Sequence, residues 1–345
     1  MRFKLEELGL KALLITKAEN IRYISGFTGG SDAKLLLSLQ EKYIITDARY
    51  TEQVGIEAPG WELMEKRPGQ TAKINELLKS YSKLGFETSI SYNAYLDLQK
   101  SLGDNLVPTN NIIEDLRQIK SADELDKLRK TALISDEVFK EIGNIIKPGI
   151  SEKTVANHIV FLLKDKGCQK EAFDTIAVAG ENAALPHGQP TDRILQKGDM
   201  LTMDYGGFYH GYAGDMTRTV AISHATDKFK DLYKKVLEAQ KLGVKMVQAG
   251  VMAKDIDMKV RAKLEEFGLG KYFHHSTGHG LGLEVHELPS ISSKSDIILQ
   301  ENMVITIEPG IYIKGWGGIR IEDTVIVKKD GCEIITHSDK ELTIF

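Results

Sequence analysis

Two aspartates, Asp204 and Asp215, stand at symmetric positions in one predicted β-hairpin, Met200–Ala221. Alternating and β-branched residues flank a loop rich in glycine and tyrosine, which predicts the two strands. With the loop centre between Tyr209 and His210, a simple register sets both carboxylates opposite each other on one face. Like charges in that position destabilise a sheet, and a bound cation would remove the cost. A shifted register, with one aspartate facing solvent, is the alternative that this stretch leaves open.

A second acidic pair, Glu308 and Glu322, repeats this geometry near the C-terminus. The two residues are symmetric about Gly315, between predicted strands at Met303–Ile313 and Gly318–Val327. Carboxylate oxygens together with one imidazole suit manganese, cobalt, zinc or iron(II). The two hairpins, with one histidine set among glycines, therefore predict a two-metal site. One short stretch holds four of the nine histidines of the chain: His274, His275, His279 and His286.

Composition places the chain among ordinary soluble globular proteins, since 42% of the 345 residues are hydrophobic and 27% are charged. A net charge of −4 gives no electrostatic reason to expect nucleic acid as a partner. No apolar run reaches membrane-spanning length and no signal-peptide core is seen, so neither a membrane nor secretion is expected. Cys168 and Cys332 form neither a disulfide framework nor a paired metal motif. The expected location is the cytoplasm.

The elements that must position these residues fall into two regions. Residues 1–118 predict a small α/β unit, in which Asp47, Arg49 and Tyr50 form a polar group interpreted as a structural salt bridge rather than a substrate contact. The predicted strands are Ala12–Thr16, Ala33–Leu39, Lys42–Thr46 and 85–87, and the predicted helices are Phe3–Leu8, Thr71–Lys83 and Tyr92–Leu102. A turn-rich link is expected at Val107–Lys120, where Pro108 and two asparagines occur.

The second region, residues 119–345, predicts two helices followed by a sheet, twice over. Ser121 and Glu124 make a capping box for a helix that runs to about Ile146. Ser151 caps the next helix, and a strand is expected at Phe173–Ala179. Two amphipathic helices separate the hairpins, at Ala225–Gln248 and Ala253–Phe267. The repeat suggests an internal duplication, with the metal site between the halves.

Five motifs follow one another along residues 120–345: LPHGQPTDR at 185–193, MDYGGFYHGYAGDMTRT at 203–219, HSTGHGLGLEVHE at 275–287, IEPGIYI at 307–313 and GIRIEDT at 318–324. In these motifs the sequence resembles the pita-bread metallopeptidase family, which includes methionine aminopeptidase, aminopeptidase P, prolidase and the metal-free creatinase. The segment around GIRIED is similar to the proline-specific branch. The resemblance implies an α+β chain, with a pita-bread catalytic domain at 119–345 and a creatinase-type α/β N-terminal domain at 1–118.

The resemblance also implies a ligand set for two divalent ions, with manganese expected and cobalt, zinc or iron as alternatives. Asp204 would chelate one ion, and Asp215 and Glu322 would bridge both. His279 and Glu308 would complete the ligands of the opposite ion. A bridging hydroxide would attack the peptide carbonyl, and Glu308 would carry the proton to the leaving proline nitrogen.

Three further histidines match family residues around the substrate. His187 and His286 match residues that contact the substrate and stabilise the tetrahedral oxyanion. His275 matches a residue on the proline side of the pocket. His274 is taken as a neighbour without a role.

Two residues are expected to support the ligands from behind. Arg320 shares a strand face with Glu322 by period-two alternation, so its guanidinium can hydrogen-bond a ligating carboxylate. Thr217 lies on the Asp215 face by the same rule and is a weaker candidate for this role.

The expected substrates are short peptides with proline in second place, and family members are commonly dimers, so a homodimer is expected. Short prolidases tend to carry an arginine just after the His-Glu-x-Pro segment, where this chain has Ser290. That difference favours an Xaa-Pro aminopeptidase over an Xaa-Pro dipeptidase. A methionine aminopeptidase and a metal-free peptide-binding scaffold are the remaining alternatives.

Overall fold

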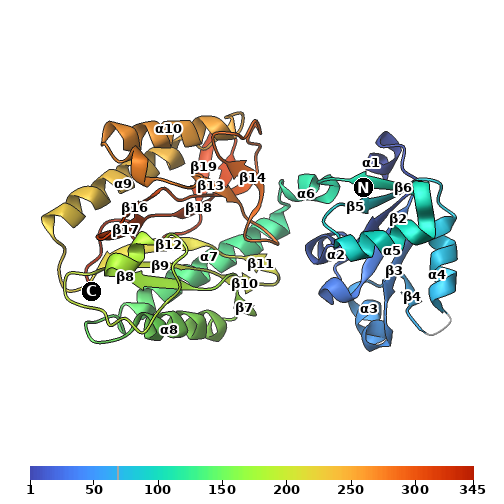
Figure 1. Ribbon diagram of the computed structural model, residues 1–345, viewed down its shortest axis with the longest axis horizontal. Helices are drawn as coiled ribbons and strands as arrows, with labels where there is room; N and C mark the ends of the chain where they lie inside the picture. Colours follow the sequence, from blue (N-terminus) through green and yellow to red (C-terminus); the bar gives the residue numbers. More distant parts are fainter. Residues whose placement is uncertain (68–69) are drawn as a thin grey trace. The chain divides into compact units, whose positions relative to one another are not determined.

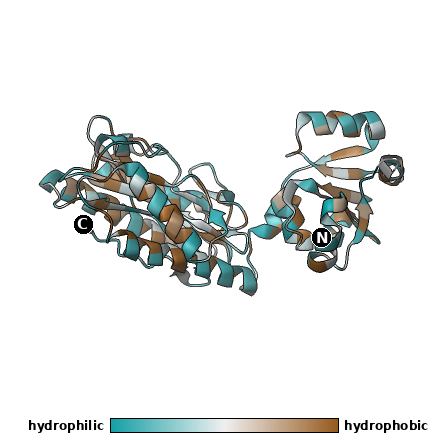
Figure 2. Ribbon diagram, turned by 90° about the horizontal axis from the view of Figure 1, so that it is seen from below, coloured by the Kyte–Doolittle hydropathy of each residue, from teal (hydrophilic) through white to brown (hydrophobic). Residues whose placement is uncertain are grey.

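The computed structural model describes residues 1–67 and 70–345, and two compact units account for them, Met1–Arg117 and Gln118–Phe345 (Figure 1). Both units are built largely from amphipathic elements. Hydrophobic and hydrophilic residues alternate along their helices (Figure 2), which is typical of elements with one face on a core.

The first unit is a six-stranded mixed sheet in the order β4-β3-β2-β1-β5-β6. Its strands are β1 (Ala12–Ile15), β2 (Lys34–Ser38), β3 (Lys42–Thr46), β4 (Glu62–Glu65), β5 (Leu84–Glu87) and β6 (Leu106–Thr109). Its helices are α1 (Arg2–Glu7), α2 (Ala18–Ser25), α3 (Thr51–Glu57), α4 (Gln70–Lys79), α5 (Tyr92–Leu102) and α6 (Ile112–Arg117). The predicted strands and helices are confirmed, and the predicted salt bridge joins Arg49 to Asp47 at 2.8 Å on the surface.

The two units divide within the segment Val107–Lys120, but the expectation that this segment is a turn-rich link is wrong. Leu106–Thr109 is a strand of the sheet, paired in parallel with β5, and Ile112–Arg117 is a helix. Pro108 and the two asparagines were interpreted as turn residues. A strand at the edge of a sheet tolerates proline, and β6 is the last strand in the order.

The second unit contains the two predicted helix pairs, α7 (Ala122–Ile142) with α8 (Glu152–Asp165), and α9 (Asp227–Met246) with α10 (Ala253–Glu266). The capping box at the start of α7 is confirmed, because the Ser121 and Glu124 side chains and backbone amides satisfy each other. The helix ends four residues earlier than predicted, at Ile142.

Strands of the second unit form several small sheets between these helices. One sheet has the order β12-β9-β8 and another β14-β13-β15-β18-β19, with the two-stranded β16-β17 and the three-stranded β11-β10-β7 beside them. The bounds are β7 (Lys170–Glu171), β8 (Ile176–Ala179), β9 (Met200–Tyr205), β10 (Gly207–Tyr209), β11 (Tyr212–Ala213), β12 (Met216–Ala221), β13 (Gly278–Gly280), β14 (Glu287–Ile291), β15 (Val304–Ile307), β16 (Gly310–Ile313), β17 (Gly317–Arg320), β18 (Asp323–Lys328) and β19 (Gly331–Ile334).

The register of the first hairpin differs from the predicted one. Asp204 of β9 pairs with Thr217 of β12, not with Asp215. The turn lies one residue later than expected, at His210 and Gly211, which both have positive φ. Paired turn residues with positive φ suit the twist of a hairpin, and the loop composition did not locate them. The two-residue offset keeps both aspartates on the same face, so they are diagonal neighbours instead of opposite ones.

The second hairpin has the predicted symmetry. Ile307 pairs with Asp323, and Gly310 pairs with Arg320. Glu308 and Glu322 therefore hold matching places in the gap between two ladders, where the chain leaves one sheet and enters another. Their backbone N–H groups donate to carbonyls outside the hairpin, Glu308 to Thr277 and Glu322 to Thr217.

Candidate metal centre

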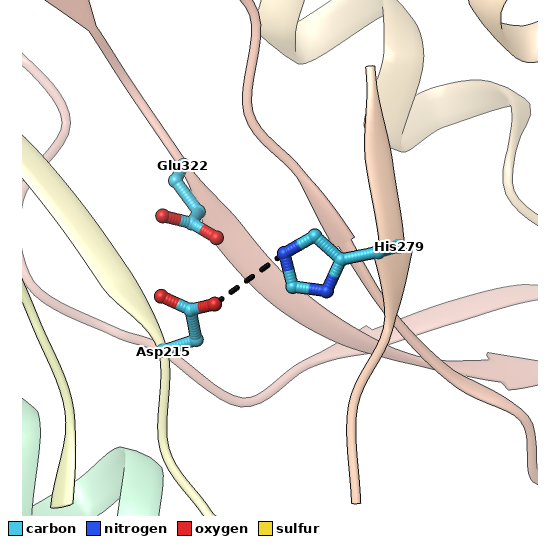
Figure 3. Close-up of side chains that lie close together, drawn as sticks. All are labelled: Asp215, His279 and Glu322. Atoms are coloured by element: carbon cyan, nitrogen blue, oxygen red, sulfur yellow. Dashed lines mark ion pairs between the residues drawn. The ribbon is translucent and has the colours of Figure 1, made fainter. Parts of the chain in front are cut away.

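Three side chains from separate segments converge closely enough to hold one metal ion. One ligand atom each from Asp215, His279 and Glu322 lies within 4.8 Å of the others. Asp215 directly precedes β12, His279 is the middle residue of β13, and Glu322 directly precedes β18. Both carboxylates point toward the imidazole in Figure 3, and Asp215 Oδ2 is 3.5 Å from His279 Nε2.

The other two predicted ligands border the same space. Glu308 Oε1 lies 3.3 Å from His279 Nε2. Asp204 enters from β9, and its Oδ2 accepts a 2.6 Å hydrogen bond from Arg320 Nη2. All five line one cavity of about 560 Å³. The structure thus brings the whole predicted set together, while their roles as ligands stay a prediction.

Glycines on either side of His279 let neighbouring strands approach its backbone. A Cβ added to Gly278 would lie 1.9 Å from the carbonyl oxygen of Thr306, and one added to Gly280 would lie 2.2 Å from that of Leu288. Only glycine fits both positions. The register that places the imidazole in the cavity therefore depends on them.

Burial and mutual repulsion set the protonation of the carboxylates. Burial, with the Glu322 charge second, raises the pKa of Asp215 well above its ordinary value. Burial and the Glu308 charge raise the pKa of Glu322 in the same way. Glu308 differs: burial works against its ionised form, but the hydrogen bond and charge of His279 lower its pKa to about 2. The Glu308 contact correspondingly raises the pKa of His279 against the effect of burial.

Two buried oxygens show that the cluster suits a cation. Within the described chain, Asp204 Oδ1 and Glu322 Oε1 are buried without a hydrogen-bond partner. A buried oxygen without a hydrogen-bond partner is costly, and an ionised carboxylate oxygen can only accept hydrogen bonds. Divalent cations would satisfy both and offset the repulsion among four acids. Four carboxylates and one imidazole are a donor set that manganese, iron, cobalt or zinc accepts.

Arg320 and Thr217 contact the acids, as predicted. Arg320 binds Asp204 rather than its strand neighbour Glu322, and its Nε donates to Thr217 Oγ1 at 3.0 Å. The Thr217 hydroxyl in turn donates to Glu322 Oε2 at 2.7 Å. Arg320 and Thr217 are buried, so each fixes the orientation of a predicted ligand.

Tyr312 is a cavity residue that the sequence analysis missed. Its hydroxyl accepts a 2.8 Å hydrogen bond from Arg320 Nη1 and lies 2.9 Å from His275 Nε2. Period-two alternation from Glu308 would have found it, because Gly310 and Tyr312 follow on the same face. Gly310 leaves room for the tyrosine, since an added Cβ would lie 2.6 Å from that hydroxyl.

The predicted substrate histidines also line the cavity, whereas His274 does not. The ring of His286 is 4.2 Å from that of His279, edge to face. His275 packs edge to face on Phe273 at 5.0 Å. Burial lowers the pKa of both His275 and His286, which favours neutral rings. His187 lies on the cavity wall as well.

The remaining wall mixes apolar and polar residues that the sequence analysis did not single out: Phe173, Asp174, Ile176, Gln189, Val285 and Glu287. Glu287 forms a buried ion pair with Lys120 at 2.8 Å. Ser290 is also part of this wall.

Among the described helices, none has both the length and the apolar character needed to cross a bilayer.

Comparison with known proteins identifies the family of both units. Residues 126–329 match the model of metallopeptidase family M24, and residues 1–119 match the creatinase/prolidase N-terminal domain. An uncharacterized peptidase, YqhT of Bacillus subtilis, is 42% identical over 98% of this chain and 97% of its own length.

Two solved structures cover nearly all of the chain. The Xaa-Pro dipeptidase from Bacillus anthracis is 39% identical, with a TM-score of 0.96 over 100% of this chain and 98% of that one. The X-Pro aminopeptidase from Thermotoga maritima is 35% identical, with a TM-score of 0.89 over 99% and 100%. The predicted α+β pita-bread fold is confirmed. The chain therefore belongs to metallopeptidase family M24, behind a creatinase/prolidase N-terminal domain, and is a metallo-exopeptidase.

Proposed function

We propose that this chain is a dinuclear-metal Xaa-Pro aminopeptidase, which removes the first residue of peptides that have proline in second place. The observation that carries the proposal is the charge on the cavity wall. Arg320 is the one arginine or lysine in the described lining. Its donors are engaged by Asp204, Thr217 and Tyr312. A free proline carboxylate, which a dipeptidase must hold, finds no unengaged cation on this wall.

Ser290 supports the same reading. It lines the cavity at the position after the His-Glu-x-Pro segment where short prolidases tend to have arginine. A serine hydroxyl offers one neutral donor to a carboxylate, whereas a guanidinium offers a charged fork. A longer peptide has an amide after proline and needs no such charge.

Each catalytic role falls to a residue of the cavity. The five predicted ligands would hold divalent ions, which when bound would polarise the scissile carbonyl and lower the pKa of water towards neutrality. Glu308, ionised at neutral pH, takes the proton from the attacking water and delivers it to the proline nitrogen. His187 and His286 donate N–H groups to the oxygen on which negative charge develops.

Aromatic rings provide a surface for the proline. His275 and Tyr312 both line the cavity, with ring centroids 5.5 Å apart. Aromatic ring surfaces suit a pyrrolidine ring, which has no N–H to satisfy. We take manganese as the metal and a homodimer as the assembly.

An Xaa-Pro dipeptidase is the second candidate function. The Bacillus anthracis relative carries that name. Neutral histidines on the wall can donate hydrogen bonds to a carboxylate. These bonds provide part of the stabilisation that a cation would give.

A substrate panel tests the proposal. Ala-Pro, Ala-Pro-Ala and Met-Ala-Ala are offered with manganese or cobalt. The expected result is a kcat/KM for Ala-Pro-Ala at least tenfold above that for Ala-Pro, with Met-Ala-Ala uncut. A preference for Ala-Pro would assign the chain to the dipeptidases. Turnover of Met-Ala-Ala alone would make it a methionine aminopeptidase.

The variant Ser290→Arg probes the missing cation directly. We expect it to raise kcat/KM for Ala-Pro about tenfold relative to that for Ala-Pro-Ala, through a lower KM, because the dipeptide carboxylate gains a charged partner. Ser293→Arg is the matched control, since it adds the same charge three residues further along the chain, just after β14 and outside the cavity lining. Equal ratios in the two variants would contradict the argument from charge.

A further inference from the structure

A buried ion pair lies behind the metal site and outside the cavity lining. Arg218 of β12 and Asp323 of β18 have side chains 1% and 0% exposed, with Nη2 and Oδ1 3.0 Å apart. Burying two charges is expensive unless the geometry and the remaining hydrogen bonds are good. No step of the proposed mechanism uses either residue, so their burial needs another explanation.

The contacts of Arg218 point to the metal ligands. Its Nη1 donates to the backbone carbonyls of Thr217 and Glu322, the residue that supports a predicted ligand and that ligand itself. Residues 321–322 lie between β17 and β18, so the Glu322 carbonyl has no hydrogen-bond partner in a pair of strands. An unpaired buried carbonyl would be costly. The guanidinium replaces the missing ladder bond.

The other side of the guanidinium holds the C-terminal segment. Arg218 Nε and Nη2 donate to the carbonyl of Ser338 at 3.2 and 2.8 Å. Asp136 of α7 anchors that segment, because its carboxylate accepts from the backbone N–H groups of His337 and Ser338 at 2.8 and 2.7 Å. Arg218 therefore binds the C-terminal segment on one side and the Glu322 carbonyl on the other.

The Asp323 carboxylate accepts hydrogen bonds from three further side chains. Its Oδ1 accepts from Thr336 at 3.1 Å, and its Oδ2 accepts from Gln240 at 2.8 Å and from Lys340. Two of these three donors belong to the C-terminal segment. The fork of the guanidinium is thereby fixed in one orientation, which a flexible lysine ammonium would not provide.

We propose that Arg218 is a positioning residue for the metal ligand Glu322, and that the C-terminal segment Thr336–Lys340 forms the other half of this support. Glu322 is then held at three points. Its backbone N–H donates to Thr217 O at 3.2 Å, its carbonyl accepts from Arg218, and its side chain accepts from the Thr217 hydroxyl. The inference rests on the proposed function, because it assumes that Glu322 binds metal.

Manganese affinity of the metal-free full-length protein provides the test, read from the free Mn²⁺ signal in electron paramagnetic resonance. Arg218→Lys keeps the charge and loses the fork. We expect it to bind the more weakly held ion 10–100 times less tightly, the usual cost of losing a partner behind a ligand. Arg193→Lys is the matched control, because it breaks a two-pronged pair with Asp199 that lies outside the cavity lining.

The variant Asp136→Asn tests the C-terminal segment separately, because it leaves both residues of the Arg218–Asp323 ion pair unchanged. We expect several-fold weaker manganese binding, and no added loss in the double variant with Arg218→Lys, since one contact serves both. Wild-type affinity in Asp136→Asn, or in a folded Arg218→Lys, overturns the inference while leaving the proposed function intact. A wild-type protein that binds no manganese or cobalt overturns the proposed function and this inference together.

Discussion

The four acids of the predicted metal site are divided among three partners, and this division helps four carboxylates to share one cavity. Arg320 holds Asp204, Thr217 holds Glu322, and His279 lies beside both Glu308 and Asp215. Of these acids in the described chain, Asp204 is the one whose carboxylate accepts a hydrogen bond from a guanidinium. The pKa values of Asp215 and Glu322 are raised because burial and neighbouring acids oppose their ionisation. A metal ion would lower both, because it binds the ionised forms.

The variant Asp215→Asn is expected to abolish hydrolysis and to lower the metal content of the purified protein. An amide keeps the shape but loses the charge that would bridge two cations. Metal content by mass spectrometry, together with kcat, measures the effect. Asp227→Asn, at an exposed position on α9, is the control. Retained turnover at a full metal load would remove Asp215 from the site.

The variant His286→Ala is expected to keep the metals and to lose about 10²–10³ in kcat, the typical cost of one oxyanion donor. His286 lies beside His279 but outside the three-residue metal cluster. His274→Ala, in the same histidine stretch but outside the cavity lining, should leave kcat unchanged. If His286→Ala loses metal instead, His286 would have to be reassigned as a ligand.

Among the elements, the short strand β13 matters most for the site because it carries His279 between two neighbours. It pairs with β14 on one side and β15 on the other. Thr306 of β15 joins two predicted ligands: its hydroxyl accepts from the His279 N–H at 3.1 Å and donates to Glu308 at 3.3 Å. The glycines of β13 make this close approach possible.

The variant Gly278→Ala is expected to destabilise the protein by about 1–3 kcal/mol, as overpacking does, and to weaken metal binding. The added methyl would meet the Thr306 carbonyl, so β13 must shift and take His279 with it. Thermal unfolding and manganese titration measure the two effects. Gly55→Ala is the control, because its methyl meets nothing and removes backbone freedom from a helix. Wild-type metal affinity in Gly278→Ala would show that the strand does not set the ligand position.

At the scale of the whole molecule, the site assembles from segments far apart in the sequence within the second unit. Its predicted ligands come from the first hairpin, the histidine stretch and the second hairpin, and lie between residues 204 and 322. In the sequence, the helix pair α7–α8 precedes the first hairpin, and the pair α9–α10 precedes the histidine stretch and the second hairpin. Such a site exists only when the unit is folded, so metal binding and folding are thermodynamically linked.

Metal removal is expected to lower the stability of the unit Gln118–Phe345. An ion at about 100 times its Kd adds about 2.7 kcal/mol, which for a unit of this size is a Tm shift of about 5–11 °C. Calorimetry with EDTA or with manganese measures the shift, with magnesium as the control cation. An unchanged Tm in EDTA would show that the protein holds no structural divalent ion at this site.

The fold class, the main helices and the residues that would meet could be predicted from the sequence. Side-chain alternation, a local property of a strand, suggested the acidic pairs of the two hairpins, and the five motifs that resemble a known family implied the fold and the full set of predicted ligands. The symmetry about Gly315 was correct because a short turn fixed the register of Glu308 and Glu322. The edge strand at Leu106–Thr109 was missed because Pro108 was interpreted as a turn residue, and sheet order decides whether a strand can accept a proline.

Only the tertiary structure decided how the acids are partnered. Asp204 and Asp215 are diagonal because the turn at His210 and Gly211 shifted the register, which the loop composition could not reveal. Arg320 binds Asp204 across two sheets, and Arg218 reaches both Glu322 and the C-terminal segment. Contacts of this kind join residues about a hundred positions apart. They depend on how separate sheets pack, and no local periodicity encodes that.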